Sequence, residues 1–440
     1  MKVYIETLGC PKNEVDSQMA AGMLEGAGFE RTFDPAQAEV ILVNTCAFIQ
    51  DAKEESIDTI FEMARYKEGR CRLLAVTGCL GQRYCDELYR QMPEADLIIG
   101  VNDYARLPEL IEETLKKGRR KQRSLDCGVF EEFPGITAGI KNASAYLKIA
   151  EGCNNCCTYC VIPQIRGGYR SRKKEAVLEE ARALAAQGAK ELVLIAQDVT
   201  NYGRDFGDGY ELPDLLQDLA KIDGVKWIRL MYCYPDKITK RLAEEIRDNP
   251  KVCKYIDMPV QHGSDDILKA MNRRSTKAQI QQVVRMLRKE VPGIVIRTTI
   301  IVGFPGERAA QFDELYDFIE EMRFDRMGVF TYSKEENTPA GQMKPQVRRD
   351  VKERRRDALM QLQQEISLEN NRKRIGEVCE VLVEEGPDEE NGYLGRTSQD
   401  ASEIDNAVIF SSRKKLEHGT FVRVKITDAF DYDLTGEVLG

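Results

Sequence analysis

The sequence has little of what marks membrane proteins, secreted proteins and zinc proteins. It contains no apolar run approaching the length needed to cross a bilayer, and its mean hydropathy is negative. It opens Met-Lys-Val-Tyr with no cleavable signal. Only two of its 440 residues are histidine, and neither follows a cysteine pair at zinc-finger distance. We therefore expect a cytoplasmic protein with no membrane role, and the sequence disfavours a structural zinc site.

The 13 cysteines are an odd number, and in a reducing cytosol they argue against a disulfide framework. Six of them show no ligand spacing and are interpreted as core or incidental thiols: Cys71, Cys85, Cys127, Cys233, Cys253 and Cys379. The others fall into two groups, which carry most of the functional information.

The first group is Cys153-Asn-Asn-Cys156-Cys157-Thr-Tyr-Cys160. Three thiolates from one tight loop can hold three irons of a 4Fe-4S cluster and leave the fourth iron open to a substrate. We predict Cys153, Cys157 and Cys160 as these ligands, although the spacing also allows Cys153, Cys156 and Cys160. Cys156 is equally a candidate fourth ligand of a purely electron-carrying cluster. A zinc knuckle or a set of structural thiols is the alternative interpretation.

The second group lies in the first third of the chain, where three apolar runs rich in β-formers end in Cys10, Cys46 and Cys79. Helical patterns separate the runs, which predicts a parallel sheet whose carboxyl strand ends share one edge. A single cysteine of this kind is more often a buried small hydrophobe. Three at equivalent strand ends predict a second iron-sulfur cluster.

The sequence predicts an α/β multidomain protein with three parts. Residues 1–125 form an α/β domain, and residues 139–370 contain six strand-and-helix units, which suggests an open partial barrel. A long charged helix is expected over 348–374. Short alternating strands over 378–383, 407–409, 420–426 and 435–439 predict a small β-barrel in residues 373–440.

The first cysteine group and the residues after it, 161–172, resemble the radical S-adenosylmethionine (radical SAM) methylthiotransferases, and the resemblance covers essentially the whole chain. Within that family the motif Thr7-Leu-Gly-Cys10-Pro-Lys-Asn13 is similar to the branch that modifies a ribosomal protein. The tRNA-modifying branch typically shows Gly-Cys-Gln-Met-Asn there. Residues 395–405 also resemble the ribosomal-protein branch. The chain departs from the family pattern at Cys156, usually not a cysteine, and at Ser402, where proline is expected.

This resemblance implies a flavodoxin-like N-terminal domain, an open partial (β/α)6 barrel and a C-terminal barrel of the TRAM type. It implies two 4Fe-4S clusters, S-adenosylmethionine (SAM) and a reducing electron donor. The cluster on Cys153, Cys157 and Cys160 would split SAM, and the resulting radical would take a hydrogen from the β-carbon of an aspartate in ribosomal small-subunit protein twelve. The cluster on Cys10, Cys46 and Cys79 would carry the sulfur, which a second SAM methylates.

Further residues are expected to contact SAM. Gln197 and Gln261 lie at the ends of predicted barrel strands, and Tyr159 precedes the last cysteine. Arg297 could clamp the methionine carboxylate, with an internal ion pair as its alternative role. Gly303 would let the backbone approach the adenosyl group. His262 lies beside Gln261 and is assigned evenly to a functional or a structural role.

All of the net charge lies in the last part of the chain. Residues 376–440 hold six Lys and Arg against fifteen Asp and Glu, a net of −9 that equals the net charge of the whole chain. An acidic module would repel phosphates, so direct RNA binding by this barrel is not expected. We predict that it clamps a basic protein partner through acidic residues such as Asp400, Glu403 and Asp405. Acidic loops that only maintain solubility are the alternative.

Two other functions stay open at this point. A tRNA methylthiotransferase is the closest alternative, which the charge distribution disfavours. An iron-sulfur electron carrier or scaffold would leave the predicted barrel without a purpose.

Overall fold

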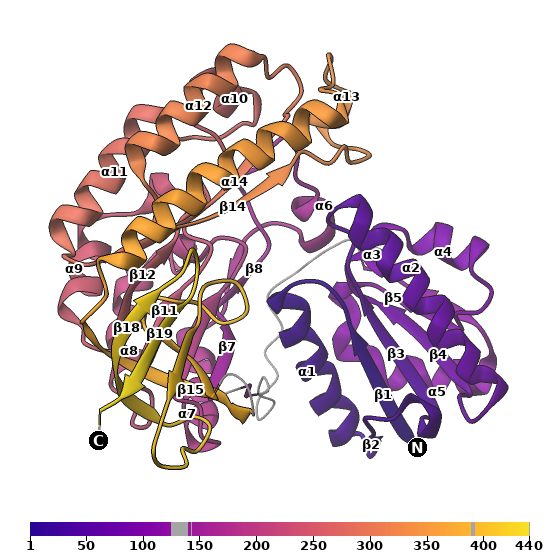
Figure 1. Cartoon of the computed structure of the whole chain (residues 1–440). Helices are drawn as coiled ribbons and strands as arrows, with labels where there is room; N and C mark the ends of the chain where they lie inside the picture. The colour runs from indigo at the N-terminus through magenta and orange to yellow at the C-terminus, as the bar shows by residue number, and fades with distance from the viewer. Residues whose placement is uncertain (125–139, 142, 389–391, 440) are drawn as a thin grey trace.

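The computed structural model describes residues 1–124, 140–141, 143–388 and 392–439. An α/β domain, a larger α/β core and a small β-barrel follow one another along the chain (Figure 1). Within the described residues, no helix combines the length and the apolar character that a bilayer span requires.

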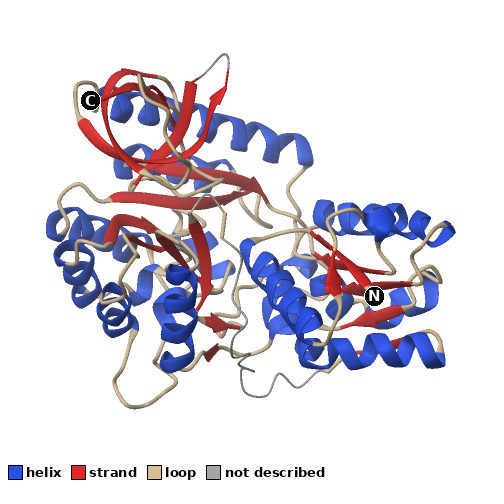
Figure 2. Cartoon of the chain, turned by 90° about the horizontal axis from the view of Figure 1, so that it is seen from below, coloured by secondary structure: helices blue, strands red, loops and turns tan. Residues whose placement is uncertain are grey.

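The N-terminal domain is a six-stranded parallel sheet in the order β2-β1-β3-β4-β5-β6, the flavodoxin-like arrangement with one further strand at its edge. Ile41 and Val43 of the middle strand pack into one hydrophobic cluster, while Val40 and Leu42 pack into another on the opposite face. Helices cover both faces (Figure 2), which is why this strand is apolar throughout. The elements are β1 (Lys2–Thr7), α1 (Pro11–Gly26), β2 (Glu30–Arg31), β3 (Val40–Thr45), α2 (Gln50–Ala64), β4 (Leu73–Thr77), α3 (Gly78–Arg83), α4 (Cys85–Gln91), β5 (Leu97–Ile99), α5 (Leu107–Lys117) and β6 (Arg120–Gln122).

The core is a second parallel sheet of six strands, in the order β14-β13-β12-β11-β10-β7, which confirms the open partial barrel. Its strands are β7 (Ser144–Lys148), β10 (Glu191–Ile195), β11 (Trp227–Leu230), β12 (Val252–Asp257), β13 (Val295–Val302) and β14 (Arg326–Thr331), and a separate pair is formed by β8 (Ala150–Glu151) and β9 (Arg170–Ser171). The helices are α6 (Ile162–Arg166), α7 (Lys174–Ala186), α8 (Leu212–Ala220), α9 (Lys240–Asp248), α10 (Asp265–Ala270), α11 (Lys277–Glu290), α12 (Ala309–Met322), α13 (Pro339–Gln342) and α14 (Arg349–Arg372).

The two faces of the core sheet have different partners. Leu192 and Leu194 of β10 face the hydrophobic cluster formed with the surrounding helices. Val193 and Ile195, between them, face a second cluster that contains Val15 of α1 and Leu382 of the C-terminal barrel. The inner face of the partial barrel is therefore covered by both neighbouring domains.

The C-terminal barrel is closed, in the order β15-β16-β17-β19-β18. The long helix α14 packs against β14 of the core and leads into the C-terminal barrel (Figure 1). Four of the strands match the predicted segments, but β16 was not predicted. Two glycines weaken its strand pattern, and a Cβ at one of them, Gly395, would lie 2.3 Å from the carbonyl oxygen of Leu382. The strands are β15 (Val378–Asp388), β16 (Gly392–Thr397), β17 (Val408–Ser411), β18 (Phe421–Ala429) and β19 (Leu434–Val438).

Candidate active site

The loop with the first cysteine group follows β8 and is held closely by the chain that returns after α6. Gly152 has a φ of 80°, and a Cβ at this position would lie 2.1 Å from the carbonyl oxygen of Gly168. The Cys153 amide donates a hydrogen bond to the carbonyl of Gly167 at 3.1 Å. Only glycine allows this approach, so Gly152 fixes the position of the first thiol.

The thiols of three of the four cysteines in this loop lie close enough to one another for their charges to interact. Cys153 and Cys157 are buried, and Cys160 is partly buried. Burial raises the pKa of the Cys160 thiol to about 12, and the neighbouring Cys157 and Cys153 thiols add to the effect. Cys156 is exposed and has a φ of 51°. This arrangement favours Cys153, Cys157 and Cys160 as the triad and leaves Cys156 outside it.

The second group converges from three adjacent strands. Cys10 is the N-cap of α1, Cys46 follows β3 and Cys79 lies in the first turn of α3. A Cβ on Gly9 would lie 3.0 Å from the sulfur of Cys46, so the loop before Cys10 touches that thiol. Burial raises the pKa of Cys46 to about 12, and the Cys79 and Cys10 thiols add to this. Burial also raises the pKa of Cys79.

The three thiols of each triad fit the ligand chemistry of an iron-sulfur cluster. Within the described ranges, no group of three His, Cys, Asp or Glu side chains is arranged for one ion. In a 4Fe-4S cluster each thiolate binds a different iron, and the sulfurs commonly accept hydrogen bonds. Here Asn155 Nδ2 lies 3.4 Å from Cys153 Sγ, Arg273 Nη1 lies 3.8 Å from Cys157 Sγ, and Arg166 Nη2 lies 3.6 Å from Cys79 Sγ.

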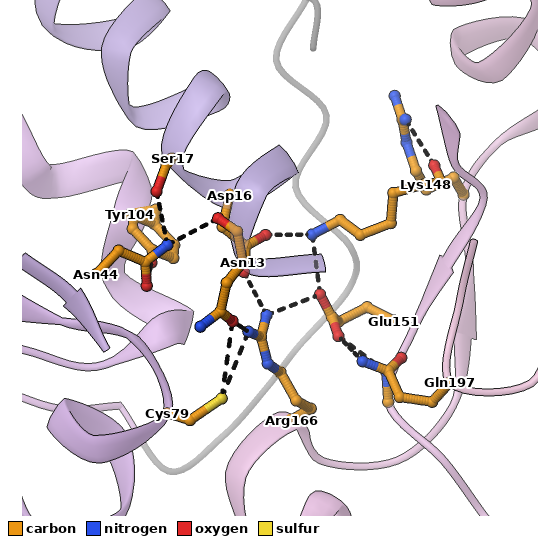
Figure 3. A network of polar contacts seen from close by, with 12 residues as sticks. Asn13, Asp16, Ser17, Asn44, Cys79, Tyr104, Lys148, Glu151, Arg166 and Gln197 are labelled. Carbon is orange, nitrogen blue, oxygen red and sulfur yellow. Dashed lines mark hydrogen bonds and ion pairs between the residues drawn. The ribbon is translucent and has the colours of Figure 1, made fainter. Parts of the chain in front are cut away.

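A buried polar network joins the two cysteine groups across the domain boundary (Figure 3). Arg166 Nη1 lies 2.5 Å from Asp16 Oδ2 of α1 and 3.2 Å from Glu151 Oε2, two residues before Cys153. Lys148 Nζ bridges the same two carboxylates, at 2.5 Å from Asp16 Oδ1 and 3.0 Å from Glu151 Oε2. With its contact to Cys79, Arg166 therefore touches both cysteine-bearing segments.

The network contains two cations and two carboxylates, so each buried charge has a partner of opposite sign that offsets the cost of its burial. Burial alone would raise the pKa of Glu151, but the charges of Lys148 and Arg166 outweigh this effect and hold that pKa well below its usual range. Each of these four side chains is less than one-tenth exposed. The domain boundary is thus fixed by complementary charge as well as by apolar packing.

Two predicted SAM contacts carry unsatisfied acceptors. Gln197 Nε2 donates to Glu151 Oε1 at 2.6 Å, but its own Oε1 is buried with no hydrogen-bond partner among the described residues. Gln261 Oε1 is in the same situation, and Gln261 has a φ of 73°. Orphaned buried acceptors call for a ligand that donates N–H groups, and the amino groups of SAM are such donors.

Two other predicted contacts have partners within the chain. Arg297 Nη1 lies 2.9 Å from Asp257 Oδ1, and its Nε lies 3.4 Å from Asp405 Oδ1 of the C-terminal barrel. This is the internal ion pair considered as its alternative role. Gly303 has a φ of 72°, and a Cβ there would lie 2.2 Å from Lys352 Cγ. A glycine is needed at position 303 for the packing of α14. The approach of Gly303 to SAM stays a prediction.

Tyr159 and His262 both have contacts within the chain. Tyr159 has its hydroxyl beside the Cys157 thiol, and burial raises the pKa of Tyr159 well above its usual value. His262 is fully buried, with its Nε2 3.5 Å from Glu307 Oε2. Its Nδ1 accepts the amide of Ser264 at 3.0 Å. Nδ1 thus has a structural partner, whereas Nε2 has no hydrogen bond among the described residues, and both roles of His262 stay open.

Several residues of the site were missed because no local pattern marks them. Arg273 contacts Cys157 from 116 positions away, and its guanidinium stacks 4.3 Å from the ring centroid of Tyr234. Asp16 lies in an ordinary helix pattern. Lys12 is buried against the ring of Tyr232, with its Nζ 3.0 Å from the ring centroid, and burial lowers the pKa of Lys12 to about 8.

The predicted acidic clamp on the C-terminal barrel is wrong for two of its three residues. Asp400 is 1% exposed and its Oδ1 lies 2.8 Å from Arg326 Nη2. Asp405 pairs with Arg297 and accepts the hydroxyl of Tyr255 at 2.6 Å. These carboxylates neutralise arginines of the core instead of facing a partner, and only Glu403 is exposed.

Comparison with known proteins identifies all three parts. Residues 2–100 match the model described as uncharacterized protein family UPF0004, residues 147–319 match the radical SAM superfamily, and residues 375–439 match the TRAM domain. The fold resembles a radical SAM methyltransferase, TsrM from Kitasatospora setae, with a TM-score of 0.56 at 15% identity over 77% of this chain and 76% of that one. At this identity the likeness concerns the fold alone.

Curated relatives match along their whole length. Ribosomal protein uS12 methylthiotransferase RimO of Acetivibrio thermocellus is 49% identical over 100% of this chain and 98% of the relative. The protein of the same name from Geobacter sulfurreducens is 50% identical over the same shares. The resemblance found in the sequence is therefore confirmed. The chain belongs to the ribosomal protein uS12 methylthiotransferases, a radical SAM family that uses S-adenosylmethionine and a 4Fe-4S cluster.

Proposed function

We propose that this chain transfers a methylthio group to the β-carbon of an aspartate in ribosomal protein uS12, with two 4Fe-4S clusters as cofactors. The observation that carries the proposal is that two cysteine triads, on different domains, are joined by one buried network through Arg166. A single-cluster electron carrier would have no use for this arrangement.

In this proposal Cys153, Cys157 and Cys160 hold the cluster that binds SAM, and Cys10, Cys46 and Cys79 hold the second. When bound, the cofactors supply the reductive cleavage of SAM and the sulfur that is methylated and transferred. The chain's own residues position them. Gln197 and Gln261 would offer buried acceptors to amino groups of SAM, and Asn155 and Arg273 donate to the sulfurs of Cys153 and Cys157, which would hold the cluster.

The substrate would reach Cys10 through a neighbouring pocket. A cavity of about 330 Å³ is lined by Cys10 and Pro11, by Glu14 and Gln18 of α1, and by Lys141 and Glu403. Burial raises the pKa of Glu14, and the nearby charge of Glu403 adds to this. Glu403 pairs with Lys141 at this opening, so the carboxylate of Glu14 is the acidic group that would face a basic polypeptide such as a ribosomal protein. The chain would act in the cytoplasm with a reducing electron donor.

Mass spectrometry tests the substrate. The reconstituted protein is incubated without oxygen with reductant, SAM and either uS12 or unmodified tRNA. A methylthio mass gain on an aspartate of uS12 is expected. A gain on the tRNA instead would replace this proposal with the tRNA alternative.

Two variants test the division of labour. Cys153→Ala should abolish formation of 5′-deoxyadenosine, because SAM would have no cluster to bind. Cys10→Ala should retain some SAM cleavage but transfer no methylthio group. Continued methylthiolation by Cys10→Ala would contradict the second-cluster assignment.

A further inference from the structure

Lys12 differs from every other buried basic residue in the described part of the protein. Eight buried lysines and arginines each form an ion pair with a carboxylate: Lys53, Lys148, Arg166, Arg172, Arg229, Arg326, Arg355 and Arg396. Lys12 is 8% exposed, and no described Asp or Glu pairs with it. Because a buried charge without a partner is costly, its presence needs an explanation.

No described carboxylate around Lys12 is free to be that partner, and the thiol of Cys10, whose negative charge would also favour the cation, is the predicted ligand of the second cluster. The ammonium of Lys12 lies over the ring of Tyr232, 3.0 Å from the centroid, a contact that stabilises a cation only partly. The carboxylate of Asp257, at the end of the neighbouring strand β12, is already used: Oδ2 accepts the amide of Tyr232 at 3.0 Å and Oδ1 pairs with Arg297. The ammonium thus retains unused donors.

The position of Lys12 indicates what its partner would be. It lies two residues after Cys10, in the first turn of α1, and α1 packs against β7 of the core. Tyr232 follows β11 at the carboxyl end of the core sheet. The next residues of the same helix, Asn13 and Asp16, contact Arg166, which also pairs with Glu151 (Figure 3). Lys12 therefore stands where the second cysteine group faces the mouth of the partial barrel.

We propose that Lys12 binds the side-chain carboxylate of the substrate aspartate and thereby sets the specificity for an acidic residue. This inference rests on the proposed function. The carboxylate of aspartate is bonded directly to the β-carbon, so an ammonium that holds it also positions the carbon to be modified. A neutral asparagine at the same place would leave the ammonium unpaired, and the site would discriminate against it.

Peptide binding tests this inference. Two fluorescein-labelled peptides of the uS12 target loop, one with its aspartate and one with asparagine in its place, are titrated with the reconstituted protein, and fluorescence anisotropy gives Kd. The unmodified protein should bind the aspartate peptide about 10- to 100-fold more tightly than the asparagine peptide. Lys12→Met should lose most of this ratio, while Lys116→Met, which removes an exposed lysine on α5, should keep it.

Three further readouts separate the possible failures. Iron content and SAM binding by equilibrium dialysis should be the same in Lys12→Met and the unmodified protein. Loss of SAM binding with an unchanged peptide ratio would overturn the inference and assign the ammonium to the carboxylate of SAM. Equal weakening of both peptides would assign Lys12 a structural role. If the unmodified protein methylthiolates no uS12 at all, the proposed function itself fails.

Discussion

Cys156 and Cys157 are neighbours in sequence but occupy different environments. Cys157 is buried and its sulfur faces Arg273, whereas Cys156 is exposed, with a left-handed backbone. We predict that Cys157→Ala loses the iron of this site and all 5′-deoxyadenosine formation. Cys156→Ala should keep both at close to the unmodified level. Iron analysis and product chromatography check this, and iron loss in the Cys156 variant alone would reverse the ligand assignment.

The guanidinium of Arg273 should tune the cluster next to it. Its Nη1 lies 3.8 Å from Cys157 Sγ, and a positive charge that donates to a cluster sulfur favours the reduced, more negative state. We predict that Arg273→Met shifts the midpoint potential of the cluster to more negative values. A redox titration followed by electron paramagnetic resonance measures it. Arg274→Met, one position along the chain, is the control, and an equal shift there would exclude a specific contact.

At this scale the sequence predicts what is local and misses what folding brings together. Cys153 and Cys160 are recognised by spacing, and Cys10 by the strand that precedes it. The contacts of Arg273, or of Asp400 with Arg326, join residues far apart in sequence. A count of acidic residues cannot tell an exposed carboxylate from a buried one, which is why the clamp prediction failed for Asp400 and Asp405.

Among the elements, β10 and β16 are joined by a buried charge cluster. Glu191 of β10 pairs with Arg229 and Arg396, and it also accepts the Ser144 hydroxyl. Burial would raise the pKa of Glu191, but the charges of Arg396 and Arg229 prevail and lower it to about 2. The folded pKa lies below the ordinary value of 4.5, so the stabilisation is present above that pH and is lost as the pH falls toward 2.

We predict that acid weakens the contact between core and barrel, by roughly 3 kcal/mol between these limits. The only tryptophan, Trp227, reports on it, because its ring packs 4.8 Å from Phe421 of β18. Its emission should shift to the red in cluster-free protein as the pH falls from about 5 to about 3. Glu191→Gln should show the shifted emission already at neutral pH. An identical pH profile in both proteins would contradict the assignment.

The elements were predictable where periodicity is strong. The strands of both parallel sheets alternate between two buried faces and read as apolar runs. The apolar pattern of the sequence runs past the end of β12 to Met258 and Val260, but Pro259 cannot donate to a strand ladder. β16 was not predicted because its glycines have low strand propensity; they are present because they allow close packing.

Across the whole molecule, the C-terminal barrel is part of the structural core rather than an appendage. Asp400 and Asp405 neutralise arginines of the core sheet, and Leu382 packs on its inner face. We predict that a chain ending at residue 375 is destabilised by at least about 3 kcal/mol, because Arg326 loses its carboxylate in a buried site. Urea unfolding followed by circular dichroism measures this. An unchanged midpoint would show that the barrel serves the substrate alone.

The network around Arg166 couples the structural integrity of the two cysteine groups. A change that removes Cys79 from the reach of Arg166 also disturbs Asp16 and Glu151, and through Glu151 the strand that leads to Cys153. We therefore expect oxidative damage at one cysteine group to disturb the other. The lifetime of the active protein in the presence of oxygen would then be set by whichever of the two cysteine groups is oxidised first.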